Sequence, residues 1–130
     1  AAAGHSLEFA RGVSTDDADT SGVEAALALA RRSDVVVAAL GDSRQTAGEW
    51  ADRASLELPG GQPALLQALG GAGVPLILVL LSGRPVTFGG VSGDALLANV
   101  SGLLSSYPPG QEGGEALARV LAGDAPPGGK

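Results

Sequence analysis

The amino-acid sequence predicts an α/β fold, a three-layer α/β/α sandwich built around a mostly parallel sheet. Two apolar runs, residues 35–40 and 74–81, have the length and composition of buried strands. A segment in which apolar residues recur at helical spacing precedes each run, so helices and strands alternate along the chain. This alternation is typical of parallel strands that are joined by right-handed crossovers, with helices packed on the sheet faces.

The first unit is expected to begin with a short strand at residues 6–10, in which Leu7 and Phe9 would share one face. After a polar stretch, Ser21 and Glu24 have the spacing of a helix capping box. The apolar positions of the helix that follows are Val23, Ala26, Leu27 and Ala30. We expect this helix to end near Arg31-Arg32, because positive charge is favourable at a helix C-terminus.

The second unit contains the strongest strand pattern in the chain. Its helix is expected to begin near Pro63, because the first helical turn tolerates proline, and its buried stripe is formed by Leu65, Leu66 and Leu69. Glycines from Gly70 onward would end the helix. The strand at residues 74–81 is apolar on both faces, which predicts a central position in a parallel sheet.

The third unit has a weaker pattern. We expect a strand at residues 100–104, a loop rich in glycine and proline at residues 107–114, and a helix at residues 115–121 that stops before Gly123. Three or four strands make a small sheet for a complete domain. We therefore expect residues 1–130 to form a single domain, present in part, of a longer protein.

Composition and charge exclude several classes of function. A net charge of −6 argues against nucleic-acid binding, which depends on cationic contacts to phosphate. No apolar run reaches the roughly 18 residues that a membrane span requires. The chain has no cysteine and only one histidine, His5, and its carboxylates lack the spacing of metal ligands. We therefore expect no metal, no cofactor, no nucleic-acid partner and no membrane contact.

The loop at residues 48–60 is the candidate functional site, because it follows a buried strand and open α/β sheets bind ligands at the carboxyl ends of their strands. Glu49 is the candidate general acid, and Trp50 beside it would line the pocket or stack on a sugar ring. A general acid must hold its proton near neutral pH, which requires partial burial or a neighbouring anion. A solvated carboxylate without a catalytic role fits the same residues, and from spacing alone it is the commoner case.

Charged residues near this loop have roles that the sequence leaves open. Asp42, which directly follows the first buried strand, would either contact a substrate hydroxyl or cap a turn. Asp52 and Arg53 would form a paired strut that supports the loop, since Arg–carboxylate pairs are often bidentate. A nucleotide site is not expected, because Gly41-Asp42-Ser43 has neither a G-x-G-x-x-G motif nor a P-loop lysine.

Five blocks of residues carry a family resemblance. In chain order they are Ser33-Asp34-Val35-Val36-Val37; Glu49-x-x-Asp52-Arg53 with Leu56-x-Leu58-Pro59-Gly60-x-Gln62; Val79-Leu80-Leu81-Ser82-Gly83-Arg84-Pro85-Val86; Tyr107-Pro108-Pro109-Gly110-Gln111-Glu112-Gly113-Gly114; and Leu121-x-Gly123-Asp124-x-Pro126-x-Gly128 with Lys130. Over residues 22–130 the chain resembles the C-terminal α/β sandwich domain of family 3 glycoside hydrolases, the group that holds β-glucosidases and β-xylosidases. The form of residues 48–53 is most similar to the β-xylosidase branch.

The resemblance implies an exo-acting, retaining β-glycosidase that hydrolyses terminal β-linked glucose or xylose. It implies that Glu49 is the general acid/base, and that the nucleophilic aspartate belongs to an N-terminal TIM-barrel domain outside this chain. The chain alone would then be inactive, and a secreted or extracytoplasmic location is favoured. The sequence departs from the family pattern at Asp42, where relatives often have Glu or Leu, and at Pro108-Pro109, where one proline is usual.

A non-catalytic role is the alternative. A domain that keeps this fold would bind carbohydrate, or serve a structural or interaction role within an assembly. The two interpretations imply different partners: the enzyme needs a glycoside substrate and the barrel domain of its own parent protein, whereas a binding module needs only the sugar.

Overall fold

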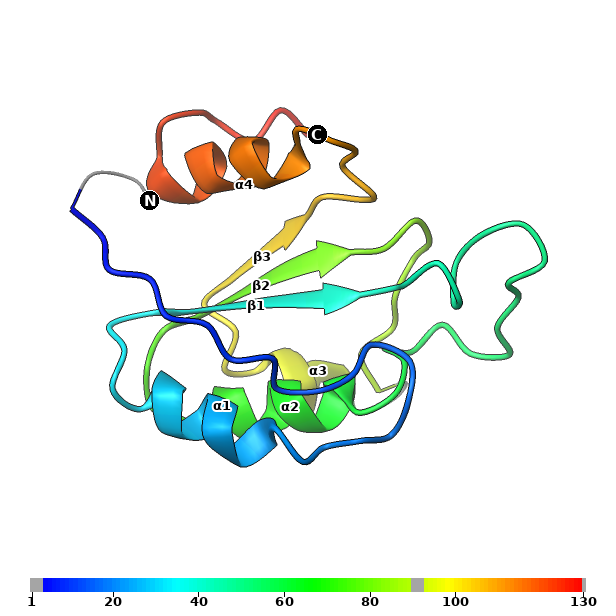
Figure 1. Cartoon of the computed structure of the whole chain (residues 1–130), viewed down its shortest axis with the longest axis horizontal. Helices are drawn as coiled ribbons and strands as arrows, with labels where there is room; N and C mark the ends of the chain where they lie inside the picture. Colours follow the sequence, from blue (N-terminus) through cyan, green and yellow to red (C-terminus); the bar gives the residue numbers. More distant parts are fainter. Residues whose placement is uncertain (1–3, 90–92, 130) are drawn as a thin grey trace.

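The computed structural model describes residues 4–89 and 93–129. Within them the elements are α1 (Val23–Ala30), β1 (Val36–Gly41), α2 (Gln62–Gly70), β2 (Leu76–Leu81), α3 (Gly93–Leu97), β3 (Gly102–Ser105) and α4 (Gly113–Ala122). The strands of this part of the chain form one parallel sheet in the order β1-β2-β3. Figure 1 shows α1, α2 and α3 on one face of the sheet and α4 on the other, so the chain forms the three layers that its sequence predicts.

β2 is the central strand, as its two-sided apolar pattern predicts. Leu76, Leu78 and Leu80 are buried against the helices, and Val79, which alternates with them, is buried as well. β1 pairs with β2 in a register that places Gly41 opposite Leu81. The two strands therefore end together, and the segments that follow them leave the sheet at the same edge.

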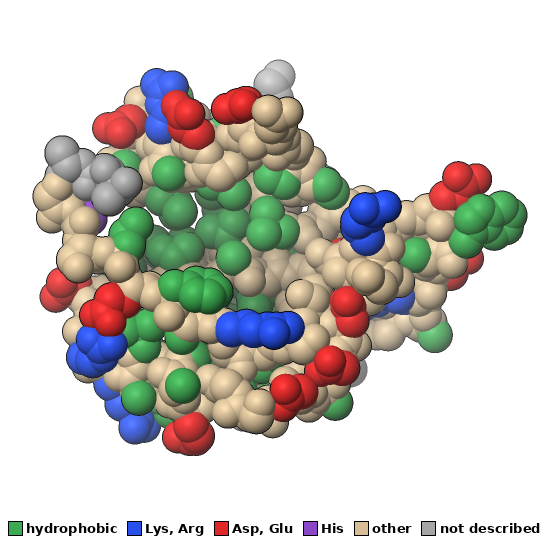
Figure 2. Space-filling model, in the orientation of Figure 1, with side chains coloured by type: hydrophobic (Ala, Val, Ile, Leu, Met, Phe, Trp, Pro, Cys, Tyr) green, Lys and Arg blue, Asp and Glu red, His purple; other side chains and the backbone are tan. Residues whose placement is uncertain are grey.

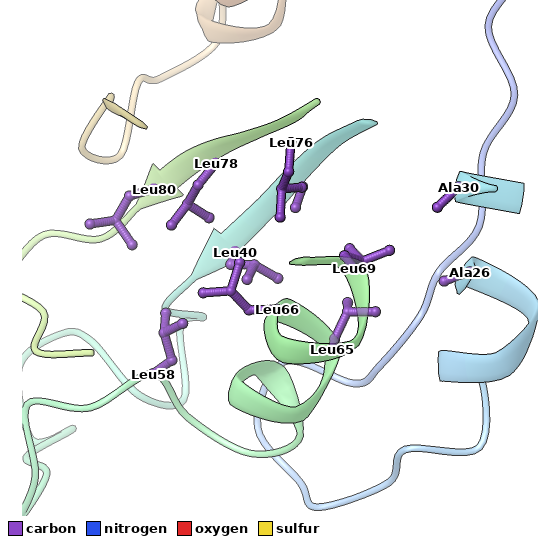
Figure 3. Close-up of a cluster of buried hydrophobic side chains, with 11 residues drawn as sticks. Ala26, Ala30, Leu40, Leu58, Leu65, Leu66, Leu69, Leu76, Leu78 and Leu80 are labelled. Atoms are coloured by element: carbon purple, nitrogen blue, oxygen red, sulfur yellow. The ribbon is translucent and has the colours of Figure 1, made fainter. Parts of the chain in front are cut away.

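The hydrophobic core lies between the sheet and α2 (Figure 3). Leu66 of α2 and Leu76 and Leu78 of β2 are fully buried. Burial of such a side chain stabilises the fold by roughly 1.5–3 kcal/mol. α1 contributes two small residues, Ala26 and Ala30, to the same core. Leucine therefore supplies most of the buried apolar area, and alanine lets α1 pack close to its neighbours.

The predicted strand at residues 6–10 is absent, and this expectation was wrong. The segment is irregular, and its apolar side chains are exposed, Leu7 by 77% and Phe9 by 89%. The segment lies near the free edge of β1, and the two line a cavity of about 370 Å³ together with side chains of α1 and α2. Alternation of apolar and polar residues predicts a strand only where a neighbouring strand accepts its hydrogen bonds, and this segment pairs with none in the described part of the chain.

Several element ends also differ from the prediction. α1 begins after Gly22 with no side-chain cap, so the expected capping box of Ser21 and Glu24 does not form. A Cβ on Gly22 would lie 2.3 Å from the carbonyl oxygen of Gly12, and this close approach admits only glycine. β3 and α4 begin two residues away from their predicted starts, and α3 was not predicted. α4 ends as expected at Gly123, whose φ of 81° is left-handed.

Candidate functional site

The candidate site is at the edge of the sheet where β1 and β2 end. The segment after β1, residues 42–58, projects from this edge as a long loop (Figure 1). Figure 2 shows the loop standing clear of the rest of the molecule, with acidic and hydrophobic side chains at its tip. A shorter segment, residues 82–89, leaves β2 beside the base of the loop, because Gly41 and Leu81 are opposite each other.

A buried glutamine that follows the loop holds the end of β1 through hydrogen bonds. Gln62, the first residue of α2, is 2% exposed. Its Oε1 accepts a hydrogen bond from the amide of Gly41 at 2.7 Å, and its Nε2 donates to the carbonyls of Gly41 at 2.7 Å and Thr15 at 2.9 Å. A Cβ on Gly41, whose φ is 148°, would be 2.0 Å from the carbonyl oxygen of Leu81. This position therefore requires glycine.

Asp42 is the hub of the polar contacts at the base of the loop. Its side chain is only 4% exposed. One carboxylate oxygen accepts a hydrogen bond from the Arg53 guanidinium at 2.5 Å, and the other accepts one from the Ser82 hydroxyl at 2.5 Å. The Nε of Arg84 is 3.9 Å from the second oxygen. The carboxylate of Asp42 thus joins the start of the loop, its returning half and the segment after β2.

These contacts keep Asp42 ionised in spite of its burial. Burial raises the pKa of this carboxyl, but hydrogen bonds from Ser82, Arg53 and Thr46, together with the charge of Arg53, outweigh it. The net pKa of Asp42 lies below its ordinary value. Its partners are therefore arranged to favour the charged form.

Arg53 and Glu57 close the returning half of the loop. One guanidinium nitrogen of Arg53 binds Asp42, and the other donates to the carbonyl of Glu57. The Glu57 carboxylate accepts a hydrogen bond from the amide of Gly89 at 2.7 Å. Arg84 reaches up from the segment after β2 and donates to the carbonyl of Ala51 at 3.3 Å. We call these contacts among residues 42, 53, 57, 82 and 84 the loop neck.

Glu49 and Trp50 lie beyond the loop neck, and both are exposed. The Trp50 side chain is 92% exposed. Its φ of 65° is left-handed, a conformation that is unusual for a bulky residue and costs roughly 1–3 kcal/mol. An exposed indole beside a carboxyl group offers a flat apolar surface and a hydrogen-bonding group to whatever binds there.

The family model for the glycosyl hydrolase family 3 C-terminal domain matches residues 4–130. The chain belongs to this family. A β-xylosidase of Formosa agariphila is 36% identical over 124 residues, which are 95% of this chain and 16% of that protein. A periplasmic β-glucosidase of Salmonella typhimurium is 39% identical over 108 residues, 83% of this chain and 14% of that protein.

Solved structures give the same result. The family 3 exo-β-xylosidase XlnD, in complex with a xylobiose aziridine activity-based probe, matches 88% of this chain and 15% of its own with a TM-score of 0.79 and 32% identity. A family 3 β-glucosidase of Bifidobacterium adolescentis matches 90% of this chain and 17% of its own with a TM-score of 0.77 and 34% identity. This family 3 domain therefore spans about a sixth of the glycosyl hydrolases it resembles.

The structure of the family 3 domain corrects one expected contact. Arg53 pairs with Asp42, whereas Asp52, the partner that the sequence predicts, is exposed. Because Arg53 turns inward to the buried Asp42, adjacency in the sequence does not decide its partner. The carboxylate of Asp42 is likewise turned inward, with both oxygens engaged by protein groups.

Other residues of the loop neck were missed by sequence reasoning. Ser82 and Arg84 follow directly after β2, and this position was a signal, because parallel strands bring their carboxyl ends to one edge. Gln62, which lies outside the loop neck, stands in the second family block, but that block did not indicate its hydrogen bonds to Gly41. Among the described residues, no group of His, Cys, Asp or Glu is placed to hold a metal ion, and no helix is long and apolar enough to cross a membrane.

Proposed function

We propose that this chain supplies the general acid/base, Glu49, to the active site of an exo-acting retaining β-glycosidase that releases terminal glucose or xylose. The observation that carries the proposal is the placement of Glu49 on an exposed loop whose base is held by buried charged contacts. The names of the relatives, β-xylosidases and β-glucosidases, support the reaction class and the two sugars. The periplasmic name of one relative supports an extracytoplasmic location.

The proposed mechanism needs two carboxyl groups about 5–5.5 Å apart, as in retaining glycosidases generally. Glu49 donates its proton to the glycosidic oxygen while the second carboxylate attacks the anomeric carbon and the aglycone leaves. Glu49, now ionised, takes a proton from water, whose oxygen attacks the same carbon and frees the sugar and the nucleophile. The second carboxylate belongs, in this proposal, to a barrel domain of the parent protein that packs over the exposed loop tip.

Substitution of Glu49 in the full-length parent tests the assignment. Glu49→Gln removes the transferable proton and keeps the shape of the side chain. Hydrolysis of a disaccharide, whose leaving group needs protonation, should fall by a factor of about 100 or more, and that of an activated aryl glycoside far less. Added azide should restore turnover of the aryl glycoside, since this nucleophile needs no general base.

The matched control is Glu115→Gln, an exposed glutamate in the first turn of α4. It should leave both rates unchanged. An equal loss on both substrate types in Glu49→Gln would contradict the acid role. The 130-residue chain by itself should release no nitrophenol from an aryl β-glycoside, because only one carboxyl group of the pair is present; measurable release would contradict the division of the site between domains.

The exposed indole of Trp50 favours a second candidate, a non-catalytic carbohydrate-binding domain, because sugar rings stack on flat aromatic faces. Calorimetric titration of the chain with xylose and glucose tests it. Two results together would support this candidate. The chain would bind a sugar at millimolar concentration or tighter, with the binding abolished by Trp50→Ala, and the Glu49→Gln variant of the parent would keep full activity. An absence of binding would leave only the enzyme or a purely structural role.

A further inference from the structure

The loop that carries Glu49 is long, and its polar attachments are concentrated at its base. The loop neck joins its two halves to each other and to the segment after β2, and the amide of Thr87, which donates to the carbonyl of Leu56 at 2.8 Å, adds one more link at the same level. The tip residues Glu49 and Trp50 are exposed, so nothing in the sheet packs against them. The position of the tip is therefore set from the neck.

Asp42 is held to the sheet through both its backbone and its side chain. Its amide donates to the carbonyl of Leu81 at 3.0 Å, and the preceding Gly41 is bound on both sides of its backbone by Gln62. The side chain is 4% exposed, against 13% for Arg53 and 25% for Arg84. Asp42 and the buried Ser82 thus form a fixed point of the sheet, to which the more exposed Arg53 and Arg84 are attached.

We propose that Asp42 is a positioning residue for Glu49, acting through Arg53, and does not itself contact the sugar. This inference rests on the proposed function, because it assumes that the position of Glu49 matters for proton transfer. Both oxygens of Asp42 already accept hydrogen bonds from the protein, so a sugar hydroxyl would have to compete with a guanidinium for a buried carboxylate. The groups of the loop that stay open to a substrate are Glu49 and Trp50 at its tip, beyond the neck.

The planar guanidinium of Arg53 explains how a fixed point at the sheet orients the loop. Its two terminal nitrogens bind different acceptors, the Asp42 carboxylate and the Glu57 carbonyl, so its position and its tilt are both defined. A lysine would keep the charge but could not hold two acceptors in a fixed plane. Displacement of a catalytic group by about 1 Å can cost a factor of about 100 in rate. Loss of the neck is therefore expected to appear in kcat.

The first experiment measures the motion of the loop tip and needs no catalytic assay. Trp50 is the only tryptophan of the chain and adjoins Glu49, so its time-resolved fluorescence anisotropy reports motion of the tip. Asp42→Asn and Arg53→Lys should both increase the amplitude of the nanosecond component while far-UV circular dichroism stays unchanged. The control Asp34→Asn, an exposed aspartate before β1, should change neither. An unchanged anisotropy decay in both neck variants would overturn the proposal.

The second experiment uses the full-length parent and separates positioning from a merely structural role. Arg53→Lys and Asp42→Asn should lower kcat on a disaccharide by a factor of about 10 to 100, with KM changed less than about twofold. In the Glu49→Gln background the same substitutions should have no further effect, because the group they position is already gone. Equal losses in both backgrounds would overturn the proposal.

The two experiments also distinguish failure of the positioning role from failure of the proposed function. If Glu49→Gln leaves the disaccharide rate intact, Glu49 is not the general acid, whatever the neck variants do. If Glu49→Gln lowers the disaccharide rate as proposed and the neck variants leave it unchanged, Glu49 is the general acid and Asp42 does not position it.

Discussion

Replacement of Gln62 by leucine should strongly destabilise the domain. Gln62 has nearly the volume of leucine, so Gln62→Leu removes hydrogen bonds without opening a large cavity. Three bonds are lost, to the amide and carbonyl of Gly41 and to the carbonyl of Thr15. The two groups of Gly41 are buried with Gln62, whereas Thr15 is exposed and regains a bond from water.

The expected loss follows from the two groups of Gly41. A buried donor or acceptor left without a partner costs about 1–3 kcal/mol, so the pair costs about 2–6 kcal/mol. This is a large part of the roughly 5–15 kcal/mol by which a domain is stable. Gln62→Glu keeps an acceptor for the Gly41 amide but places an oxygen against the Gly41 carbonyl. At neutral pH this variant should lose at least as much free energy of unfolding as Gln62→Leu.

Urea unfolding followed by far-UV circular dichroism measures this loss. At a slope of roughly 1–2 kcal/mol per molar urea, the midpoint for Gln62→Leu should fall by about 1 M or more without a change of slope. Gln67→Leu is the matched control, the same substitution on an exposed position of α2, and should stay within about 0.5 kcal/mol of the unsubstituted chain. Equal stabilities of the two variants would refute the reasoning.

Three further predictions concern the same fold. The native pKa of Asp42 is lowered, so its contribution to the free energy of unfolding is complete above its unfolded pKa of about 3.9 and is lost as the pH falls through the native pKa. Urea midpoints measured at successively lower pH should therefore fall less steeply for Asp42→Asn than for the unsubstituted chain. Leu66→Ala should cost about 2–5 kcal/mol in the same titration, because this side chain is fully buried, whereas Leu103→Ala, at a position that is 46% exposed, should cost less than half as much. Gly41→Ala should prevent folding, judged by loss of a cooperative thermal transition, because its Cβ would meet the Leu81 carbonyl; Gly114→Ala in α4, where a Cβ meets nothing within 4 Å, should raise stability by about 0.5–1 kcal/mol.

The layer order of the fold could be predicted because it depends on local patterns. Residues 74–81 are apolar at every position, so both faces of the strand are apolar, and only a central strand buries both of its faces. Residues 6–10 show the limit of such patterns. They alternate as a strand should, yet no strand of the described chain offers them a pairing edge, so Leu7 and Phe9 remain exposed.

The candidate site could be predicted in its location and not in its contacts. A loop after a buried strand indicated the edge of the sheet, and Glu49 and Trp50 lie on that loop. The partner of Arg53 was assigned to the adjacent Asp52, whereas the structure places it eleven residues away, at Asp42. A long side chain pairs with a group that lies close to it in space. Within a loop, the number of residues between two groups says little about the spatial distance between them.

The order of residues along the chain was enough to predict the alternation of helices and strands, the central place of β2, the family and the loop that carries Glu49. The contacts of Gln62 with Gly41, and those of Asp42 with Arg53, Ser82 and Arg84, depend on the folded chain. The physical reason is that periodicity reports which face of one element is buried. The loop neck, in contrast, exists only after the register of β1 with β2 has brought Gly41 beside Leu81 and so aligned the segments that follow them.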